Sequence, residues 1–341
     1  MSTQQIDIAV VGAASLAGEV VLTLLAERKF PVGKLYTVDV VEQAGSHLEF
    51  RDDPVPVHDL ASFNFEQVQL ALFFLDAPLA LEYVPRATAS GCIVIDSSVC
   101  FRYEDDVPLI IPGVNDELIA DYRERMIIAL PSSATSQLVK TIKPIYDAVG
   151  IESINVTVMM AASHMGRSGQ EELGRQTSQL LSFQTAEKNI FSEQLAFNLI
   201  ADTGFVVEGG YTTDELDLIK GAQKVLINDK ISIMATAIMA PVFFGHSEAI
   251  TLHTTVPLGT DKARELLDNC PGLQLVKASA KGRPTPVTDA SERDDITIGR
   301  VKAGLSDSEH ELNLWCVADN IRSGMALNSV QTAEILVKDY L

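Results

Sequence analysis

Residues 6 to 28 combine a short apolar strand, a turn of small residues and an amphipathic helix, and this unit constrains the fold most. Ile6–Val11 is rich in β-branched residues, and Gly12-Ala-Ala-Ser-Leu-Ala-Gly18 follows it directly. Apolar residues then recur at helical spacing up to Arg28. A strand that leads through a glycine turn into a helix is typical of a parallel α/β sheet. It places the helix N-terminus where a pyrophosphate can bind.

Further strand patterns continue this arrangement up to residue 132. They are apolar runs at residues 35–40, 68–75, 92–95 and 126–130, and a helix is expected at 78–90 between two of them. Residues 1–132 therefore predict a Rossmann-like, doubly wound parallel sheet. The carboxyl ends of its strands, which form the ligand side of such a sheet, fall at Gly12, Asp39, Asp76, Asp96 and Pro131.

Two acidic residues follow the second strand, where nucleotide-binding sheets hold the ribose. Asp39 lies 21 positions after Gly18, and Glu42 is close behind. An acid at this distance accepts from the ribose hydroxyls of NAD, and two acids would repel the extra phosphate of NADP. The pattern therefore favours NAD. The alternatives are a small-residue turn without a ligand, and an Asp39 that faces water at the end of its strand.

The pattern changes after a helix predicted at 135–149. A helix is expected at 169–187, and strands at 154–161, 231–240, 248–256, 272–280, 295–302 and 310–318 predict a mixed sheet. A last helix is expected at 320–340. The fold class is therefore α/β, with a Rossmann-like domain of residues 1–132 plus 323–341. A mixed-sheet α+β domain comprises residues 133–322.

Net charge and cysteine spacing limit the partners. The formal net charge of −20 argues against nucleic acid and anionic membranes. The four cysteines, Cys92, Cys100, Cys270 and Cys316, show no spacing typical of a metal site, so we expect no metal. No signal peptide or membrane-spanning run is recognisable, and the expected location is the cytoplasm.

Many short stretches in one order resemble the aspartate-semialdehyde dehydrogenase family over nearly the whole chain. They are Ile8–Gly12, Val107–Pro112 with Val114-Asn115, Leu195–Asn198, Gly210–Thr212, Pro241–Ala249, Arg283–Pro286, Ile298–Arg300, Asp319–Arg322 and Asn328–Glu334. The chain looks most like the Usg-type branch, whose members have altered active sites. The resemblance implies a homodimer formed by the second domain, and an amino-acid biosynthesis enzyme as the ancestor.

The resemblance also implies a chemistry, of which this chain lacks several groups. In the family a cysteine thiolate attacks the aldehyde, hydride passes to NADP and phosphate releases the acyl group. Ser133 occupies the cysteine position, in the register that Gln137 sets. The positions of a glutamine, a glutamate and the substrate-binding arginine fall on Met160, Gly221 and Met239.

Two family groups remain. His246 occupies the position of the acid/base, and Arg102 that of a phosphate-binding arginine. The nucleophile position allows two interpretations. Ser133 is a nucleophile that His246 activates, or a residue that caps the helix beginning near Thr135. Arg102 either binds an anion or forms a surface ion pair, and His164 is expected to be an exposed loop residue.

The resemblance assigns the cofactor to the first turn and the last helix. Its residues would be Gly12, Ala14, Ser15, Leu16, Ala17, Gly18, Asp39 and Asn328. Ser15 replaces the central glycine of the family turn, and Glu42 replaces an arginine that meets the NADP phosphate. The site is therefore expected to take NAD in preference to NADP, or to stay empty.

Two functions follow for the whole chain. The first is a binding or regulatory homologue without the phosphorylating dehydrogenase activity. The second is an active NAD-dependent oxidoreductase that acts on an aldehyde or acyl substrate other than aspartate semialdehyde. The sequence does not identify the small-molecule ligand.

Overall fold

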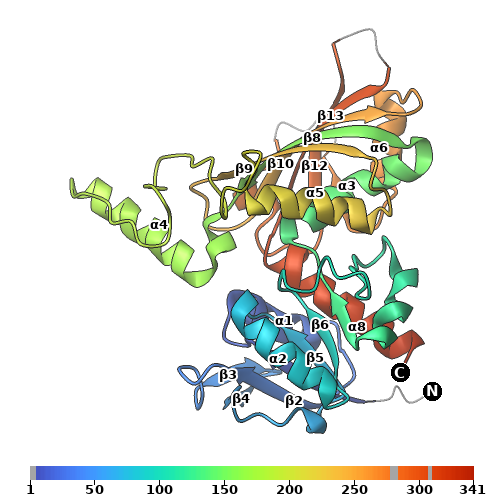
Figure 1. The fold of residues 1–341 in the computed structure, drawn as a ribbon. Helices are drawn as coiled ribbons and strands as arrows, with labels where there is room; N and C mark the ends of the chain where they lie inside the picture. The colour runs from blue at the N-terminus through green and yellow to red at the C-terminus, as the bar shows by residue number, and fades with distance from the viewer. Residues whose placement is uncertain (1–4, 277–282, 306–308) are drawn as a thin grey trace. The chain divides into compact units, whose positions relative to one another are not determined.

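The computed structural model describes residues 5–276, 283–305 and 309–341, and the chain forms two compact units (Figure 1). The first unit contains Met1–Ser132 together with Met325–Leu341, and the second contains Ser133–Gly324. Each unit has its own sheet and its own buried core.

The first unit has a seven-stranded sheet in the order β3-β4-β2-β1-β5-β6-β7. The parallel strands are β1 (Ile6–Val11), β2 (Val32–Asp39), β4 (Asp53–Asp59), β5 (Leu70–Phe73), β6 (Ile93–Asp96) and β7 (Ile127–Ala129). Strand β3 (His47–Phe50) pairs antiparallel with β4 at the edge. The helices are α1 (Leu16–Glu27), α2 (Ala77–Ala89) and α8 (Leu327–Asp339), with 3₁₀ turns η1 (Phe65–Gln67) and η2 (Asp116–Glu124). The predicted Rossmann-like sheet is confirmed.

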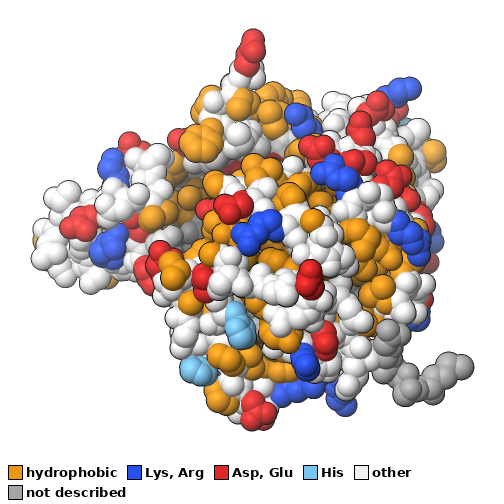
Figure 2. All heavy atoms as spheres, turned by 60° about the horizontal axis from the view of Figure 1, so that its bottom comes forward, with side chains coloured by type: hydrophobic (Ala, Val, Ile, Leu, Met, Phe, Trp, Pro, Cys, Tyr) orange, Lys and Arg blue, Asp and Glu red, His pale blue; other side chains and the backbone are white. Residues whose placement is uncertain are grey.

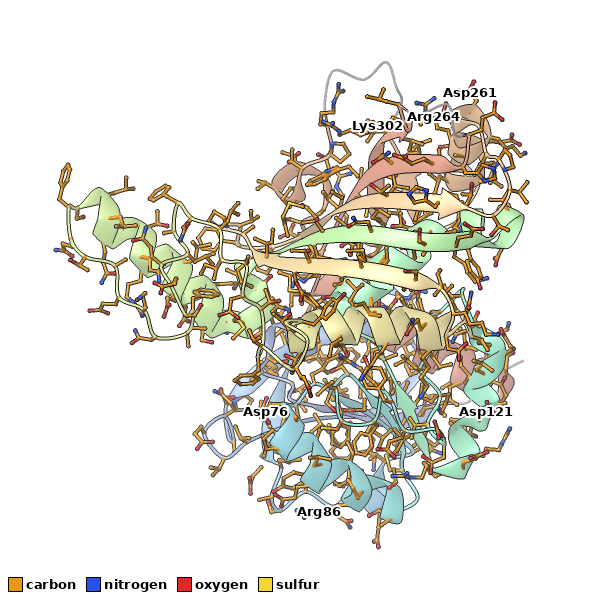
Figure 3. All side chains as sticks on the ribbon, turned by 45° about the horizontal axis from the view of Figure 1, so that its top comes forward. Asp76, Arg86, Asp121, Asp261, Arg264 and Lys302 are labelled. Atoms are coloured by element: carbon orange, nitrogen blue, oxygen red, sulfur yellow. The ribbon has the colours of Figure 1, made fainter. Side chains whose placement is uncertain are left out.

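The second unit has a six-stranded mixed sheet in the order β11-β12-β13-β10-β8-β9. Its strands are β8 (Ile151–Met160), β9 (Ser232–Met239), β10 (His246–Thr254), β11 (Leu273–Leu275), β12 (Ile296–Ala303) and β13 (Glu311–Ala318). Helices α3 (Ser133–Val149), α5 (Thr213–Val225) and α6 (Thr260–Asp268) pack against it, and a short α7 (Pro286–Asp289) lies near β13. In Figure 3, Arg264 of α6 lies near the end of β12, and its Nη2 donates to the Val301 carbonyl at 2.6 Å.

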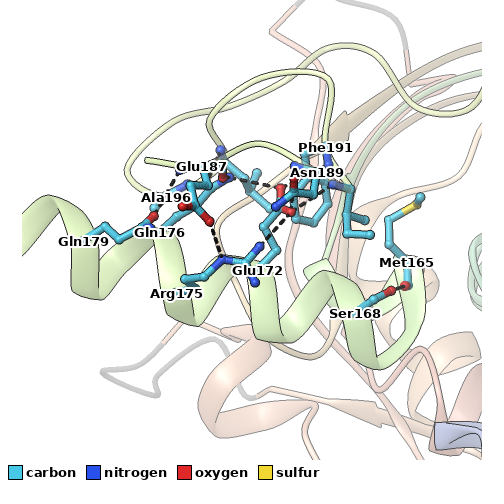
Figure 4. Close-up of polar contacts among 12 residues, drawn as sticks. Met165, Ser168, Glu172, Arg175, Gln176, Gln179, Glu187, Asn189, Phe191 and Ala196 are labelled. Carbon is cyan, nitrogen blue, oxygen red and sulfur yellow. Dashed lines mark hydrogen bonds and ion pairs between the residues drawn. The ribbon is translucent and has the colours of Figure 1, made fainter. Parts of the chain in front are cut away.

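Helix α4 (Gly166–Leu181) projects from the sheet of the second unit as an arm (Figure 1), after the 3₁₀ turn η3 (Ala162–Met165). The loop after α4 is held by the fully buried Glu172 (Figure 4). Its carboxylate accepts from the amides of Asn189 and Ile190 at 2.9 Å each, and from that of Phe191 at 3.3 Å. Gln176, also fully buried, accepts from the Leu195 amide at 2.8 Å, so two side chains of α4 hold the returning chain along the arm.

Several helix ends differ from the prediction. Helix α4 ends at Leu181 rather than 187, and Phe183 just beyond it has a positive φ of 59°. The C-terminal helix α8 begins at Leu327, after a π-helical turn at Arg322–Ala326. Helices α5 and α6 and the β3–β4 pair were not predicted. Residues 277–280 of the strand expected at 272–280 lie outside the described residues.

The surface mixes charges of both signs with apolar patches on the face that Figure 2 shows. Within the described ranges, no helix is long and apolar enough to cross a membrane.

Candidate active site

The turn between β1 and α1 is closely packed at both of its glycines. Gly12 has φ +77°, and a Cβ there would lie 2.5 Å from the Phe74 carbonyl oxygen. A Cβ on Gly18 would lie 2.5 Å from the Gly12 carbonyl oxygen. Both positions therefore require glycine, one for backbone conformation and both for close packing.

Ser15 fits the place of the family's central glycine without strain. Its φ is −73°, and its Oγ accepts from the Gly18 amide at 3.1 Å, which caps α1. The amides of Leu16 and Ala17, in the first helical turn, have no acceptor within the helix, because no carbonyl precedes them there. Two such amides at a helix N-terminus suit an anionic phosphate group. The turn therefore fits a dinucleotide.

Asp39 is only 7% exposed, so the alternative in which it faces water is wrong. Its carboxylate accepts from the Ala14 amide and from the Val40 amide, both at 2.8 Å. Asp39 thus ties the end of β2 to the glycine turn. Glu42 is exposed in the following turn, and Asn328 is fully buried on α8. The ribose and cofactor roles of these residues stay predictions.

Arg102 is buried, at 8% exposure, so the surface ion pair is wrong. Its Nε donates to the Leu130 carbonyl at 2.9 Å and its Nη2 to the Ser97 carbonyl at 2.7 Å. Burial raises the pKa of nearby Asp96 to about 6, although Ser98 Oγ donates to its carboxylate at 2.5 Å. Arg102 thus ties together the segments that follow β6 and β7, and its phosphate role stays a prediction.

Ser133 is the first residue of α3 and is 7% exposed. The expected helix start near Thr135 is therefore wrong by two residues, and the N-cap position falls on Ser132. Capping by Ser132 stays a prediction. Gly324 packs directly on Ser133, because a Cβ at Gly324 would lie 2.5 Å from the Ser133 Cβ. The serine is therefore a closely packed helix-start residue.

The positions of the missing polar groups form an apolar corner of the second unit. Met160 and Met239 pair in register at the ends of β8 and β9, and each is 3% exposed. Gly221 of α5 faces α3, where its Cβ would lie 3.0 Å from Thr135 Cγ2. Neither methionine can pair with a carboxylate, so the positions of the family's arginine and glutamine supply no polar partner here.

His246 opens β10 and is fully buried. The Ala161 amide donates to its Nδ1 at 3.1 Å, so that nitrogen carries no proton. The neutral ring must then hold its proton on Nε2. Burial, and secondly the nearby His164, lower the pKa of His246 well below its usual value of 6.5.

A general base would have to accept a proton on Nε2, where His246 already carries one. His246 is therefore a hydrogen-bond donor in this conformation. Its Nε2 is buried and has no hydrogen-bond partner among the described residues. This orientation removes the activation that Ser133 would need as a nucleophile.

His164 is not the exposed loop residue that the sequence suggests. Its Nε2 lies 3.1 Å from Asp214 Oδ2, and the two side chains are 26% and 24% exposed. Its ring centroid lies 5.9 Å from that of His246. Asp214 is 50 positions away in the sequence, so no local motif reveals the pair.

Comparisons with known proteins agree with these two units. Residues 7–122 match the semialdehyde dehydrogenase NAD binding domain, and residues 142–323 match the semialdehyde dehydrogenase dimerisation domain. The chain belongs to the aspartate-semialdehyde dehydrogenase family. An aspartate-semialdehyde dehydrogenase of Legionella pneumophila is 41% identical, over 99% of this chain and 98% of that protein.

Two further relatives of the family span the chain as fully. The crystal structure of Vibrio cholerae aspartate semialdehyde dehydrogenase II in complex with ASA has a TM-score of 0.97 and 40% identity, over 99% of this chain and 100% of that one. A USG-1 protein homolog of Pseudomonas aeruginosa is 35% identical, over 99% of this chain and 100% of that protein. The expected family membership is confirmed.

Proposed function

We propose that this family member is a homodimeric, cytoplasmic binding protein of the Usg type, without phosphorylating dehydrogenase activity. The observation that carries the proposal is the hydrogen bond from the Ala161 amide to His246 Nδ1. With Nε2 protonated, the buried histidine cannot deprotonate Ser133. A serine hydroxyl is a poor nucleophile at neutral pH without such a base.

The apolar corner supports the same proposal. In the family, by resemblance, an arginine, a glutamate and a glutamine contact the substrate. Here those positions hold Met239, Gly221 and Met160. Charged substrate groups would then lack partners, at a cost of several kcal/mol each.

A homodimer is supported by the open face of the six-stranded sheet, which lies opposite α3 and α5. A hollow of about 660 Å³ on this face is lined by Asn155, Thr157, Thr251, Asn313 and Trp315, among others. The dimerisation-domain match covers the same strands. The four cysteines are all free thiols, which suits the cytoplasm.

The alternative is an NAD-dependent oxidoreductase with another carbonyl substrate. It is favoured by the fit of the first turn to a dinucleotide. In either case we expect NAD to bind at least tenfold more tightly than NADP, which corresponds to about 1.4 kcal/mol. Calorimetry with both nucleotides measures this, and a Glu42→Arg variant should reduce the preference. Equal affinities would show that Asp39 and Glu42 do not face the ribose.

Covalent labelling tests the proposed loss of the nucleophile. A fluorophosphonate probe should label neither the wild type nor Ser133→Ala above background, as measured by intact mass. Stoichiometric labelling of the wild type that disappears in both Ser133→Ala and His246→Ala would overturn the proposal. It would mean that the histidine does activate the serine.

A further inference from the structure

His246 presents a buried ring nitrogen without a partner among the residues that the structure describes. Its Nδ1 is occupied by the Ala161 amide, and its Nε2 has no partner within the described residues. A buried donor without an acceptor costs about 1–3 kcal/mol. Native structures rarely keep such a donor unless a ligand or water completes it. The unsatisfied Nε2 therefore indicates that a ligand with a hydrogen-bond acceptor binds at this position.

His164 offers the complementary group next to it. When Asp214 is ionised it can only accept, and the His164 Nε2 that faces it at 3.1 Å is then the donor. A neutral His164 then has its lone pair on Nδ1. The same arrangement, with an aspartate behind one ring nitrogen and a lone pair on the other, makes histidine an acceptor for hydroxyl protons in hydrolases.

The spacing of the two rings fits one oxygen atom. Their centroids are 5.9 Å apart, at an interplanar angle of 55°. An oxygen about 2.8 Å from one nitrogen of each ring, with a near-tetrahedral angle at the oxygen, places those two nitrogens roughly 4.6 Å apart, which is within reach of rings at this centroid distance. A hydroxyl group can do both, since it accepts from the donor and donates to the lone pair.

We propose that His246 and His164 form a binding site for the hydroxyl group of an uncharged small molecule, in which His246 Nε2 donates and His164 Nδ1 accepts. Asp214 is the positioning residue that fixes the His164 tautomer. The ligand is uncharged because the neighbouring Met160 and Met239 offer no counter-charge. His246 lies beside this corner, since β10 pairs with β8 up to Ser247 and Met159, which are the chain neighbours of His246 and Met160. The inference rests on the proposed binding function and specifies its ligand class.

Two probes that differ only in a hydroxyl test the site, namely lactamide and propanamide. Affinities are measured at pH 8, where an ordinary imidazole is neutral, by NMR titration of protein labelled with ¹⁵N-histidine. Lactamide should bind at least tenfold more tightly than propanamide and shift the His246 Nε2 resonance. The ratio should fall below about twofold in His164→Phe and in His246→Phe, and should decrease in Asp214→Asn.

His253→Phe is the matched control, since His253 lies on the same strand but is exposed. It should keep the wild-type ratio. Equal affinities for the two probes in the wild type, no binding of lactamide, or an unchanged ratio in His164→Phe would overturn the inference. The same spectra report the His246 tautomer. A proton on Nδ1 would refute the proposed function itself, so the two failures are distinguishable.

Discussion

Restoring the thiol alone should not restore the family reaction. In Ser133→Cys, three substrate partners would still be missing at Met160, Gly221 and Met239. A hydrogen bond to a charged group contributes about 1.5–3 kcal/mol. Three losses therefore amount to about 5–9 kcal/mol. At 1.4 kcal/mol for each factor of ten, kcat/KM falls on the order of 10³ to 10⁶ below that of an intact family enzyme.

The assay is phosphate-dependent formation of NADH or NADPH from aspartate semialdehyde. Ser133→Cys should stay at background. A variant that adds Met160→Gln, Gly221→Glu and Met239→Arg should gain activity. Thr135→Ser should help it further, because it removes the methyl group 3.0 Å from the new Cβ at position 221. Robust turnover by Ser133→Cys alone would refute this reasoning, because it would show that the three positions do not face the substrate.

Three further variants test the packing of the second unit. Glu172→Gln should lower the free energy of local opening of the loop after α4 by at least about 2 kcal/mol, because it replaces a buried acceptor of three amides. Hydrogen exchange of the amides at residues 189–191 should then rise about 30-fold. Unchanged protection of these amides would contradict this. Gly324→Ala should lower the free energy of unfolding in urea by about 1–3 kcal/mol, because the new methyl group overpacks on Ser133. The loss should be smaller in a Ser133→Gly background. An equal loss in both backgrounds would show that the two residues do not collide. Burial raises the pKa of Glu248 well above its usual value of 4.5, so the folded state holds a proton that the unfolded state loses above that pH. Wild-type stability should therefore fall relative to Glu248→Gln as pH rises from 5 towards 8, and parallel pH profiles would count against a buried, protonated Glu248.

Local sequence patterns predicted the parts of the fold that depend on neighbouring residues. The strand, turn and helix of residues 6–28 follow from β-branched content, glycine placement and helical spacing. The β3–β4 pair was missed because Pro54 and Pro56 argue against a strand. In the structure both prolines face β3, and β4 pairs with β2 only from Val57 onward. The path of the chain after α4 depends on the contacts of Glu172 with residues 189–191, which no helical periodicity contains.

The candidate site also has features that the sequence predicts and features that only the tertiary structure sets. A nucleophile position without cysteine is visible in the sequence, since it depends only on residue identity. The tautomer of His246 is not, because it is set by a backbone amide 85 positions away. The His164–Asp214 pair likewise arises from the folding of η3 against the start of α5. Tertiary hydrogen bonds of this kind decide what a retained histidine can do.

Turnover of the family substrate by the unmodified protein shows whether the dehydrogenase activity is lost. Purified wild-type protein and Ser133→Ala are compared for reduction of NAD or NADP with aspartate semialdehyde and phosphate, at concentrations that saturate a family enzyme. We expect no turnover above the no-enzyme rate for either protein. Phosphate-dependent turnover by the wild type that Ser133→Ala abolishes would contradict it, since a serine activated in place would then be carrying out the reaction.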